Sequence, residues 1–204
     1  MFNIAVFVSG RGSNFQSIFN ASRTTLKNIQ IKAVVSDRDC AALDFALENK
    51  IPVYKVSSVV KKDYVLYEDL IQLLDSLKIN LIVLAGFLKK IPDELVDKYP
   101  RRIINIHPAL LPSFGGKGMY GINVHRAVFD SSAQVSGASV HFVDKIYDNG
   151  KIIAQRAVDI SSIGSPEQIA ERVLQIEHEL LPFVIEKISE DKVIVKNNRV
   201  YLLN

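Results

Sequence analysis

The sequence contains a single cysteine, Cys40, among its 204 residues. One cysteine excludes an intrachain disulfide framework and a metal cluster held by several thiolates. Long apolar runs are also missing, since none approaches the roughly 20 residues that a membrane-spanning helix needs. The N-terminal apolar run is short and has no basic segment before it, which predicts a buried strand rather than a signal peptide. We therefore expect a cytoplasmic protein that does not associate with membranes.

Blocks of one charge are absent too. Lys and Arg number 25 and Asp and Glu 22, giving a formal charge of +3. This balance does not predict a nucleic-acid-binding surface. None of the four histidines is spaced as a metal-binding pair, and HExxH is absent, so we expect no metal. The G-x-S-x-G elbow is missing as well, which argues against a serine hydrolase.

Short apolar runs alternate with helical patterns along the first half of the chain, which predicts βαβ units and a parallel sheet. Hydrophobic residues make up 48% of the chain, enough for one continuous core. The expected strands are residues 3–8, 31–36, 52–56, 80–85 and 101–106. The expected helices are residues 14–22, capped by Ser13 or Asn14, then 40–50, 62–77 and 92–99.

The second half changes character. Residues 137–143 and 151–160 predict an antiparallel pair around a loop, and a long helix begins at Pro166 with Ser165 as its N-cap. A terminal hairpin should turn at Asn197 and Asn198. We expect an α/β fold with a mostly parallel, doubly wound, Rossmann-like sheet and a mixed antiparallel C-terminal part. Residues 1–204 should form one domain, with a phosphate-binding first half and a second half that carries the catalytic loop.

The stretch "SGRGSN" forms a glycine-rich turn between a strand and a helix, a geometry that suits a phosphate. It is not a dinucleotide motif, because Phe15 occupies the position of the third glycine and no acidic residue lies about 20 residues on. "GGKG" is not a Walker motif either, since Gly118 replaces the Ser or Thr. A tight turn with no ligand remains the alternative interpretation.

The stretch "NIHPALLP" places Asn105 and His107 on one face at the end of a strand. In doubly wound sheets, ligands bind beyond the carboxyl ends of the strands. An amide donor beside an imidazole can stabilise an oxyanion and transfer a proton. The alternative is a structural histidine, and the same applies to His125, His141 and His178. Asp148 lies in "YDNG", where ordinary turn chemistry explains it equally well.

Together, "SGRGSN", "VLAGFLKKI", "NIHPALLP", "GASVHFVDKIYDNGKIIAQ" and "ERVLQIEHELLP" resemble the folate-dependent formyltransferases, and among them the phosphoribosylglycinamide formyltransferases. The resemblance covers roughly Asn3 to Phe183. It implies the formyltransferase fold and transfer of a formyl group from 10-formyltetrahydrofolate to glycinamide ribonucleotide in purine (IMP) biosynthesis. The folate is a cosubstrate that would bind to the second half of the domain. The implied partners are these small molecules, with a monomer or homodimer as the assembly.

The resemblance also implies residue roles. Asn105 would hold the oxyanion, His107 would act as general acid and proton shuttle, and Asp148 would raise the basicity of His107. The ribonucleotide would contact Gly12, Ser13, Asn14, Leu174, Gln175, Ile176 and Glu177. The folate would contact Leu88, Lys89, Lys90, Ile91, Asn105, Asp144, Lys145, Ile146, Tyr147 and Asp148.

Several points stay open from the sequence. The glycine-rich segment Ser113–Asn123 is either a mobile lid over the folate or a surface loop. A folate contact near Lys61 and Lys62 has no assignment, and Leu111-Pro112 is either cis or trans. A different acceptor amine, such as a nucleotide-linked amino sugar, is an alternative function, and so is a folate- or nucleotide-binding module without turnover.

Overall fold

The structure is a computed structural model that describes residues 1–203. The chain forms two compact units, residues 1–104 and the residues from Asn105 onward. The expected α/β fold, with a mostly parallel sheet and added antiparallel strands, is confirmed. The single domain expected over residues 1–204 stays a prediction.

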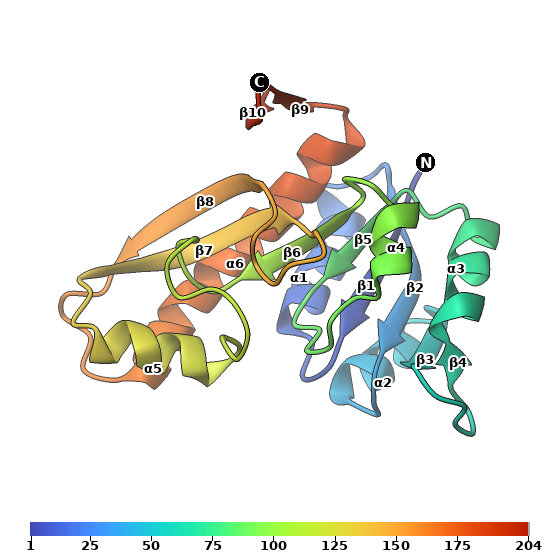
Figure 1. Ribbon diagram of the computed structural model, residues 1–204, viewed down its shortest axis with the longest axis horizontal. Coiled ribbons are helices and arrows are strands. Elements are labelled where there is room, and N and C mark those ends of the chain that lie inside the picture. The colour runs from blue at the N-terminus through green and yellow to red at the C-terminus, as the bar shows by residue number, and fades with distance from the viewer. Residues whose placement is uncertain (204) are drawn as a thin grey trace. The chain divides into compact units, whose positions relative to one another are not determined.

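The first unit is a parallel sheet in which helices join most consecutive strands, and only β3 and β4 follow each other without a helix between them (Figure 1). Its strands lie in the order β4-β3-β2-β1-β5, and each strand pairs in parallel with its neighbours in this order. The strands are β1 (Phe2–Val8), β2 (Ile29–Ser36), β3 (Val53–Ser57), β4 (Val65–Leu66) and β5 (Leu81–Leu84). The helices are α1 (Ser13–Thr24), α2 (Ala41–Glu48), α3 (Tyr67–Ser76) and α4 (Asp93–Lys98).

The centre of the first sheet is almost free of polar side chains. Residues 4–8 of β1 are fully buried, as are residues 81–83 of β5. Such unbroken apolar strands are typical of a parallel sheet covered on both faces. Since β1 and β5 are parallel neighbours, the loops that follow them leave from the same edge of the sheet.

Two expectations for the first unit are wrong in detail. The helix expected over residues 62–77 begins only at Tyr67, because Val65 and Leu66 pair with β3 as the short strand β4. In α1 the N-cap is Gly12, whose φ of 76° is left-handed, and no side chain caps the helix. The expected cap from Ser13 or Asn14 is therefore incorrect, and the glycine turn leads directly into the helix.

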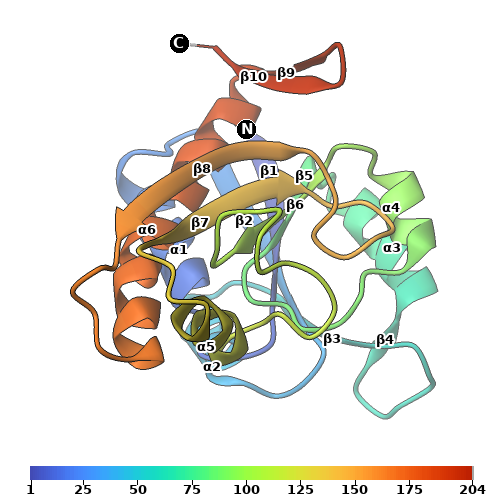
Figure 2. The ribbon, with the colours of Figure 1, turned by 60° about the vertical axis from the view of Figure 1, so that its left-hand side comes forward.

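The second unit begins within β6 (Ile103–His107), and its strands lie in the order β6-β7-β8. The antiparallel pair predicted around the "YDNG" loop is confirmed as β7 (Val135–Phe142) and β8 (Ile152–Asp159). The long helix α6 (Pro166–Ser189) packs on both strands, and α5 (Ile122–Asp130) packs on α6 (Figure 2).

Local signals at the C-terminal end of the chain are confirmed. The hydroxyl of Ser165 accepts the N–H of Gln168 and caps α6 as expected. The hairpin of β9 (Val193–Lys196) and β10 (Arg199–Leu202) turns at Asn197 and Asn198, both with positive φ. Helix α5 was not expected, and it begins within the segment Ser113–Asn123 that was treated as a loop.

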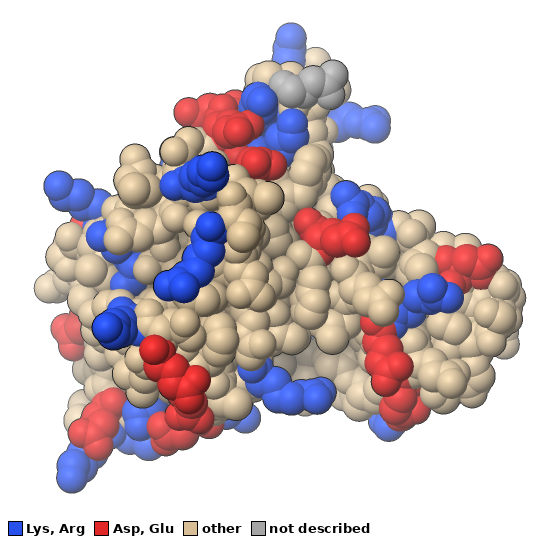
Figure 3. All heavy atoms as spheres, turned by 180° about the vertical axis from the view of Figure 1, so that it is seen from behind, with Lys and Arg blue, Asp and Glu red and all other residues tan. Residues whose placement is uncertain are grey.

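Charged side chains of both signs are interspersed on the face shown in Figure 3. Within the described residues, no helix combines the length and the apolarity needed to cross a bilayer. The described residues also contain no group of three or more His, Cys, Asp or Glu arranged to hold a metal ion.

Candidate active site

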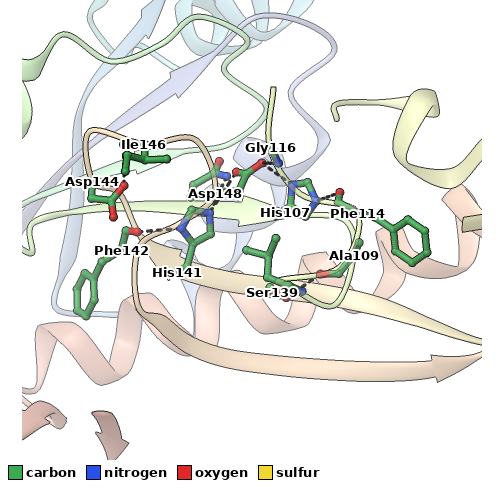
Figure 4. A network of polar contacts seen from close by, with 12 residues as sticks. His107, Ala109, Phe114, Gly116, Ser139, His141, Phe142, Asp144, Ile146 and Asp148 are labelled. Atoms are coloured by element: carbon green, nitrogen blue, oxygen red, sulfur yellow. Dashed lines mark hydrogen bonds and ion pairs between the residues drawn. The ribbon is translucent and has the colours of Figure 1, made fainter. Parts of the chain in front are cut away.

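The end of β6 carries a cluster of polar side chains in the second unit (Figure 4). His107 Nδ1 lies 3.6 Å from one carboxylate oxygen of Asp148, and His141 Nε2 lies 3.6 Å from the other. The amide nitrogen of Asn105 lies 3.1 Å from the same His141 Nε2. The structure thus brings together the three residues expected to be catalytic, together with a histidine to which the sequence assigned no function.

His107 is buried and its ring orientation is fixed. Only 3% of the residue is exposed, and its Nε2 lies 2.8 Å from the carbonyl oxygen of Phe114. Because a carbonyl can only accept, Nε2 carries the proton and Nδ1 faces Asp148. Burial lowers the pKa of His107 more than Asp148 and the Phe114 carbonyl raise it. The ring is therefore neutral at pH 7, with Nδ1 available as a proton acceptor.

Asp148 is held in a turn with a φ of 51°, which directs its carboxylate back toward the two histidines. One carboxylate oxygen also accepts the backbone N–H of Gly116 at 2.8 Å. Burial raises the pKa of Asp148, but the contacts around its carboxylate, among them the hydrogen bond from the Gly116 N–H, bring it below the ordinary value. The carboxylate is therefore ionised at neutral pH beside Nδ1 of His107.

His141 orients the amide of Asn105. The Nδ1 of His141 donates to the backbone carbonyl of Phe142 at 2.8 Å, which leaves the lone pair of Nε2 for the amide. One N–H of the Asn105 amide donates to that lone pair, which leaves the second N–H for another acceptor. The signal for His141 in the sequence was its place in "SVHFVD", directly before the turn that carries Asp148.

A second hydrogen-bond network supports the chain after His107. The hydroxyl of Ser139 donates to the carbonyl of Ala109 at 2.6 Å and accepts the N–H of Leu111 at 3.0 Å. Gln155 donates to the same hydroxyl and to the carbonyl of Leu111. The Leu111-Pro112 bond is cis. These contacts fix the path of "PALLP" and hence the loop that bonds His107.

Residues 113–116 are part of this site rather than a free loop. Phe114 accepts a hydrogen bond from His107, and Gly116 donates one to Asp148. Gly115, between them, is tightly packed. A Cβ there would lie 2.5 Å from Leu111 Cδ2 and 3.2 Å from the Cβ of Asp148. A lid formed by the remainder of Ser113–Asn123 stays a prediction.

The predicted phosphate turn lies in the first unit, between β1 and α1. Gly12 has left-handed backbone geometry, and Ser13 and Asn14 open the helix. The first backbone N–H groups of a helix have no carbonyl partner within it, so this turn directs donors outward. A Cβ on Gly12 would lie 2.6 Å from the Cβ of Ala42, so α2 packs directly against the turn.

The residues expected to orient the ribonucleotide in the second unit lie in the middle of α6. Four consecutive helical residues point in different directions, so their side chains do not share one face of the helix. Glu177 is buried, with 7% exposure, whereas Gln175 is exposed and Leu174 and Ile176 are half-buried. Glu177 therefore differs from the other three, because it is the buried residue among them and carries a carboxylate.

The two segments expected to contact folate are loops, and each belongs to a different unit. In the loop after β5, Leu88, Lys89 and Lys90 are exposed and Ile91 is buried. In the loop between β7 and β8, Lys145, Ile146 and Tyr147 are exposed and Asp144 is half-buried.

The second loop is shaped by its own backbone. Asp144 accepts the N–H of Ile146 at 2.8 Å, and a Cβ on Gly150 would lie 1.7 Å from the carbonyl oxygen of Phe142.

The open contact near Lys61 and Lys62 stays unassigned, and the ammonium of Lys61 lies 3.8 Å from the ring centre of Tyr64.

Comparison with known proteins identifies the family of this chain. Residues 2–185 match the model of the family described as formyl transferase. The chain is 43% identical over 193 residues to a chloroplastic phosphoribosylglycinamide formyltransferase of Arabidopsis thaliana, covering 93% of this chain and 66% of the plant protein. It is 41% identical over 202 residues to the protein of that name from Vigna unguiculata, covering 98% of this chain and 65% of the relative.

A solved structure gives the same result. The crystal structure of phosphoribosylglycinamide formyltransferase from Anaplasma phagocytophilum superposes with a TM-score of 0.89 at 29% identity, covering 100% of this chain and 94% of that chain. The chain spans about two-thirds of the length of the two plant relatives. With the family model matched over most of its length, this chain belongs to the formyl transferase family.

Proposed function

We propose that this protein transfers the formyl group of 10-formyltetrahydrofolate to the amine of glycinamide ribonucleotide. The products are formylglycinamide ribonucleotide and tetrahydrofolate, a step of purine biosynthesis. The observation that carries the proposal is the cluster of Asn105, His107 and Asp148 in a member of the formyl transferase family. Relatives at 41% and 43% identity are named for this reaction.

The chemistry of the cluster suits attack on a formyl carbon without a covalent enzyme intermediate. As the amine nitrogen bonds to the formyl carbon, the C=O electrons move to oxygen and form an oxyanion. The second amide N–H of Asn105 is the donor for that oxyanion. The same amide is held by His141, so it does not have to reorganise during the reaction.

In this proposal His107 transfers the proton from the attacking amine to the folate nitrogen. The attacking amine becomes positively charged, and the unprotonated Nδ1 of His107 takes up its proton. The carboxylate of Asp148, 3.6 Å away, stabilises the resulting imidazolium. His107 then returns the proton toward the folate nitrogen as the carbon–nitrogen bond to the folate breaks, so the proton count balances.

Substrate binding divides over several segments in the same proposal. The backbone N–H groups from Gly12 to Asn14 would receive the ribonucleotide phosphate, because the start of α1 attracts anions. The buried carboxylate of Glu177 would contact the glycinamide part. The folate would lie against Leu88–Ile91 and Asp144–Asp148, which combine exposed apolar side chains with backbone polar groups.

The test is formyl transfer from 10-formyltetrahydrofolate to glycinamide ribonucleotide by the wild type and by His107→Ala. We expect the rate to fall by about 10²–10⁴ in the variant, since it loses the group that moves the proton. Circular dichroism and tetrahydrofolate affinity serve as controls and should be unchanged. Folate binding without turnover in the wild type would instead indicate another acceptor amine or a binding module.

Location and assembly stay predictions for this chain. The plant relatives are named chloroplastic. We propose a cytoplasmic monomer or homodimer that takes its two small-molecule substrates without a metal ion.

A further inference from the structure

The hydroxyl of Ser9 joins three loops of the first unit. Ser9 is the first residue after β1 and is 6% exposed. Its Oγ donates to a carboxylate oxygen of Asp37 at 2.6 Å and accepts the backbone N–H of Leu88 at 2.9 Å. Asp37 directly follows β2, and Leu88 lies in the loop after β5. One hydroxyl therefore connects the carboxyl ends of three strands, two of which are direct neighbours of the third.

Asp37 commits the Ser9 hydroxyl to this arrangement. The side chain of Asp37 is 6% exposed, and its second oxygen accepts two hydrogen bonds from Arg38 at 3.0 and 2.6 Å. Burial raises the pKa of Asp37, but the hydrogen bonds from Arg38 and Ser9 together lower it below the ordinary value. The ionised carboxylate accepts the hydrogen bond of the Ser9 hydroxyl. The lone pairs of Oγ are then available to accept the N–H of Leu88. A hydroxyl that donates to a carboxylate is also a stronger acceptor.

Both oxygens of Asp37 are occupied by these contacts. An acidic residue at the end of the second strand of a dinucleotide-binding fold receives a ribose hydroxyl. The contacts of Asp37 instead satisfy Ser9 and Arg38. Its contacts therefore indicate a positioning role.

The turn that follows Ser9 is itself held firmly. The carbonyl of Gly10 accepts the N–H of Ala42 at 3.2 Å, and Gly12 packs against the same residue. By contrast, the side chains of Leu88 and of the two lysines after it are exposed. The Ser9–Leu88 hydrogen bond thus fastens an exposed loop to a rigid turn.

We propose that Ser9 is a positioning residue that holds the loop Leu88–Ile91 in place for folate, although its side chain does not contact the folate. This inference rests on the proposed function, which assigns the loop to the folate cosubstrate. If it holds, loss of the hydroxyl weakens folate binding and leaves the proton transfer at His107 intact. The change therefore appears in KM for the folate and not in kcat.

The experiment compares Ser9→Ala with Ser136→Ala in the full chain. Ser136 is also buried, at 3% exposure, and its hydroxyl has no hydrogen-bond partner within the described residues, so it is a matched control. We measure amide hydrogen exchange at Leu88, the Kd of tetrahydrofolate by calorimetry, and both kinetic constants. For Ser9→Ala we expect faster exchange at Leu88, a Kd and a folate KM raised about 3- to 10-fold, and kcat within about twofold. Ser136→Ala should match the wild type in all of these.

A second variant keeps the test decisive if Ser9→Ala unfolds. Asp37→Asn retains a carbonyl oxygen for the Ser9 hydroxyl but loses the charge that orients it, so exchange at Leu88 should be faster and the tetrahydrofolate Kd higher than in the wild type. Faster exchange at Leu88 with an unchanged tetrahydrofolate Kd would overturn the inference. A wild type that binds tetrahydrofolate but does not formylate glycinamide ribonucleotide would overturn the proposed function and leave the role of Ser9 standing.

Discussion

At the scale of residues, the site depends on which nitrogen of each histidine is anchored to a backbone carbonyl. His107 uses Nε2 for the carbonyl of Phe114, and His141 uses Nδ1 for the carbonyl of Phe142. The remaining nitrogen of each ring faces Asp148. The same imidazole group thus has two tasks: His107 presents a proton acceptor, and His141 orients the amide of Asn105.

His141→Ala tests this division of labour. The amide of Asn105 would lose the acceptor that fixes it, so we expect kcat to fall about 10-fold, with a smaller change in either KM. Removal of the oxyanion donor itself in Asn105→Ala should lower kcat by a factor of about 10²–10³. Steady-state kinetics of both single variants and of the double variant measure the coupling. If His141 acts through Asn105, the double variant is about as slow as Asn105→Ala alone, and fully additive losses would contradict the role.

At the scale of elements, the loop between β7 and β8 places Asp148. This loop closes tightly because Gly150 lies against the backbone of Phe142, where a Cβ would come within 1.7 Å of the carbonyl oxygen. The left-handed backbone of Asp148 and the contacts of Asp144 complete the turn. The glycine two residues after Asp148 therefore has a steric reason, since only glycine fits against Phe142 at that position.

Gly150→Ala should destabilise the fold and displace Asp148. Because the obstacle is backbone, we expect a loss of about 2–3 kcal/mol in the free energy of unfolding and a clear fall in kcat. Urea denaturation and formyl-transfer kinetics provide the two measurements. Gly164→Ala is the matched control, since the nearest atom to its Cβ would be 3.8 Å away and it should change stability by less than about 1 kcal/mol. Equal stabilities of the two variants would disprove the steric argument.

At the scale of the whole molecule, buried histidines make stability depend on pH. His125 on α5 is 5% exposed, and within the described residues its Nδ1 has no hydrogen-bond partner. Burial, aided by the nearby His107, lowers the pKa of His125 from 6.5 to about 4. Between these values the unfolded chain binds a proton that the folded protein does not. The free energy of unfolding therefore falls as the pH falls from about 6.5 toward 4.

Urea denaturation at pH 7.5 and pH 5 measures this effect in the wild type and in His125→Leu. We expect the wild type to lose about 2 kcal/mol more than the variant between the two pH values, because only the wild type carries this titration. A similar loss in both proteins would show that His125 is protonated in the folded state.

Most of the fold was predictable because its signals are local. Apolar runs such as Ile4–Val8 and Leu81–Leu84 indicate strands of a parallel sheet, because such strands are buried on both faces and therefore carry apolar side chains on both. The cap at Ser165 and the turn at Asn197-Asn198 likewise depend on neighbouring residues only. Helix α5 escaped prediction because it follows a glycine-rich segment that has no side-chain cap signal.

The sequence by itself determined the order and type of most elements and placed an amide and an imidazole at the end of one strand. Only the tertiary structure decided which side chains join Asn105 and His107. His141 comes 36 residues after Asn105, and no spacing rule relates the two. Side chains distant in sequence meet only when strands pair and loops close, and the proton-bearing nitrogen of each ring then follows from the carbonyl it meets. Sheet pairing and loop closure therefore decided that Asp148 and His141 lie beside Asn105 and His107, and together these residues form the candidate catalytic site.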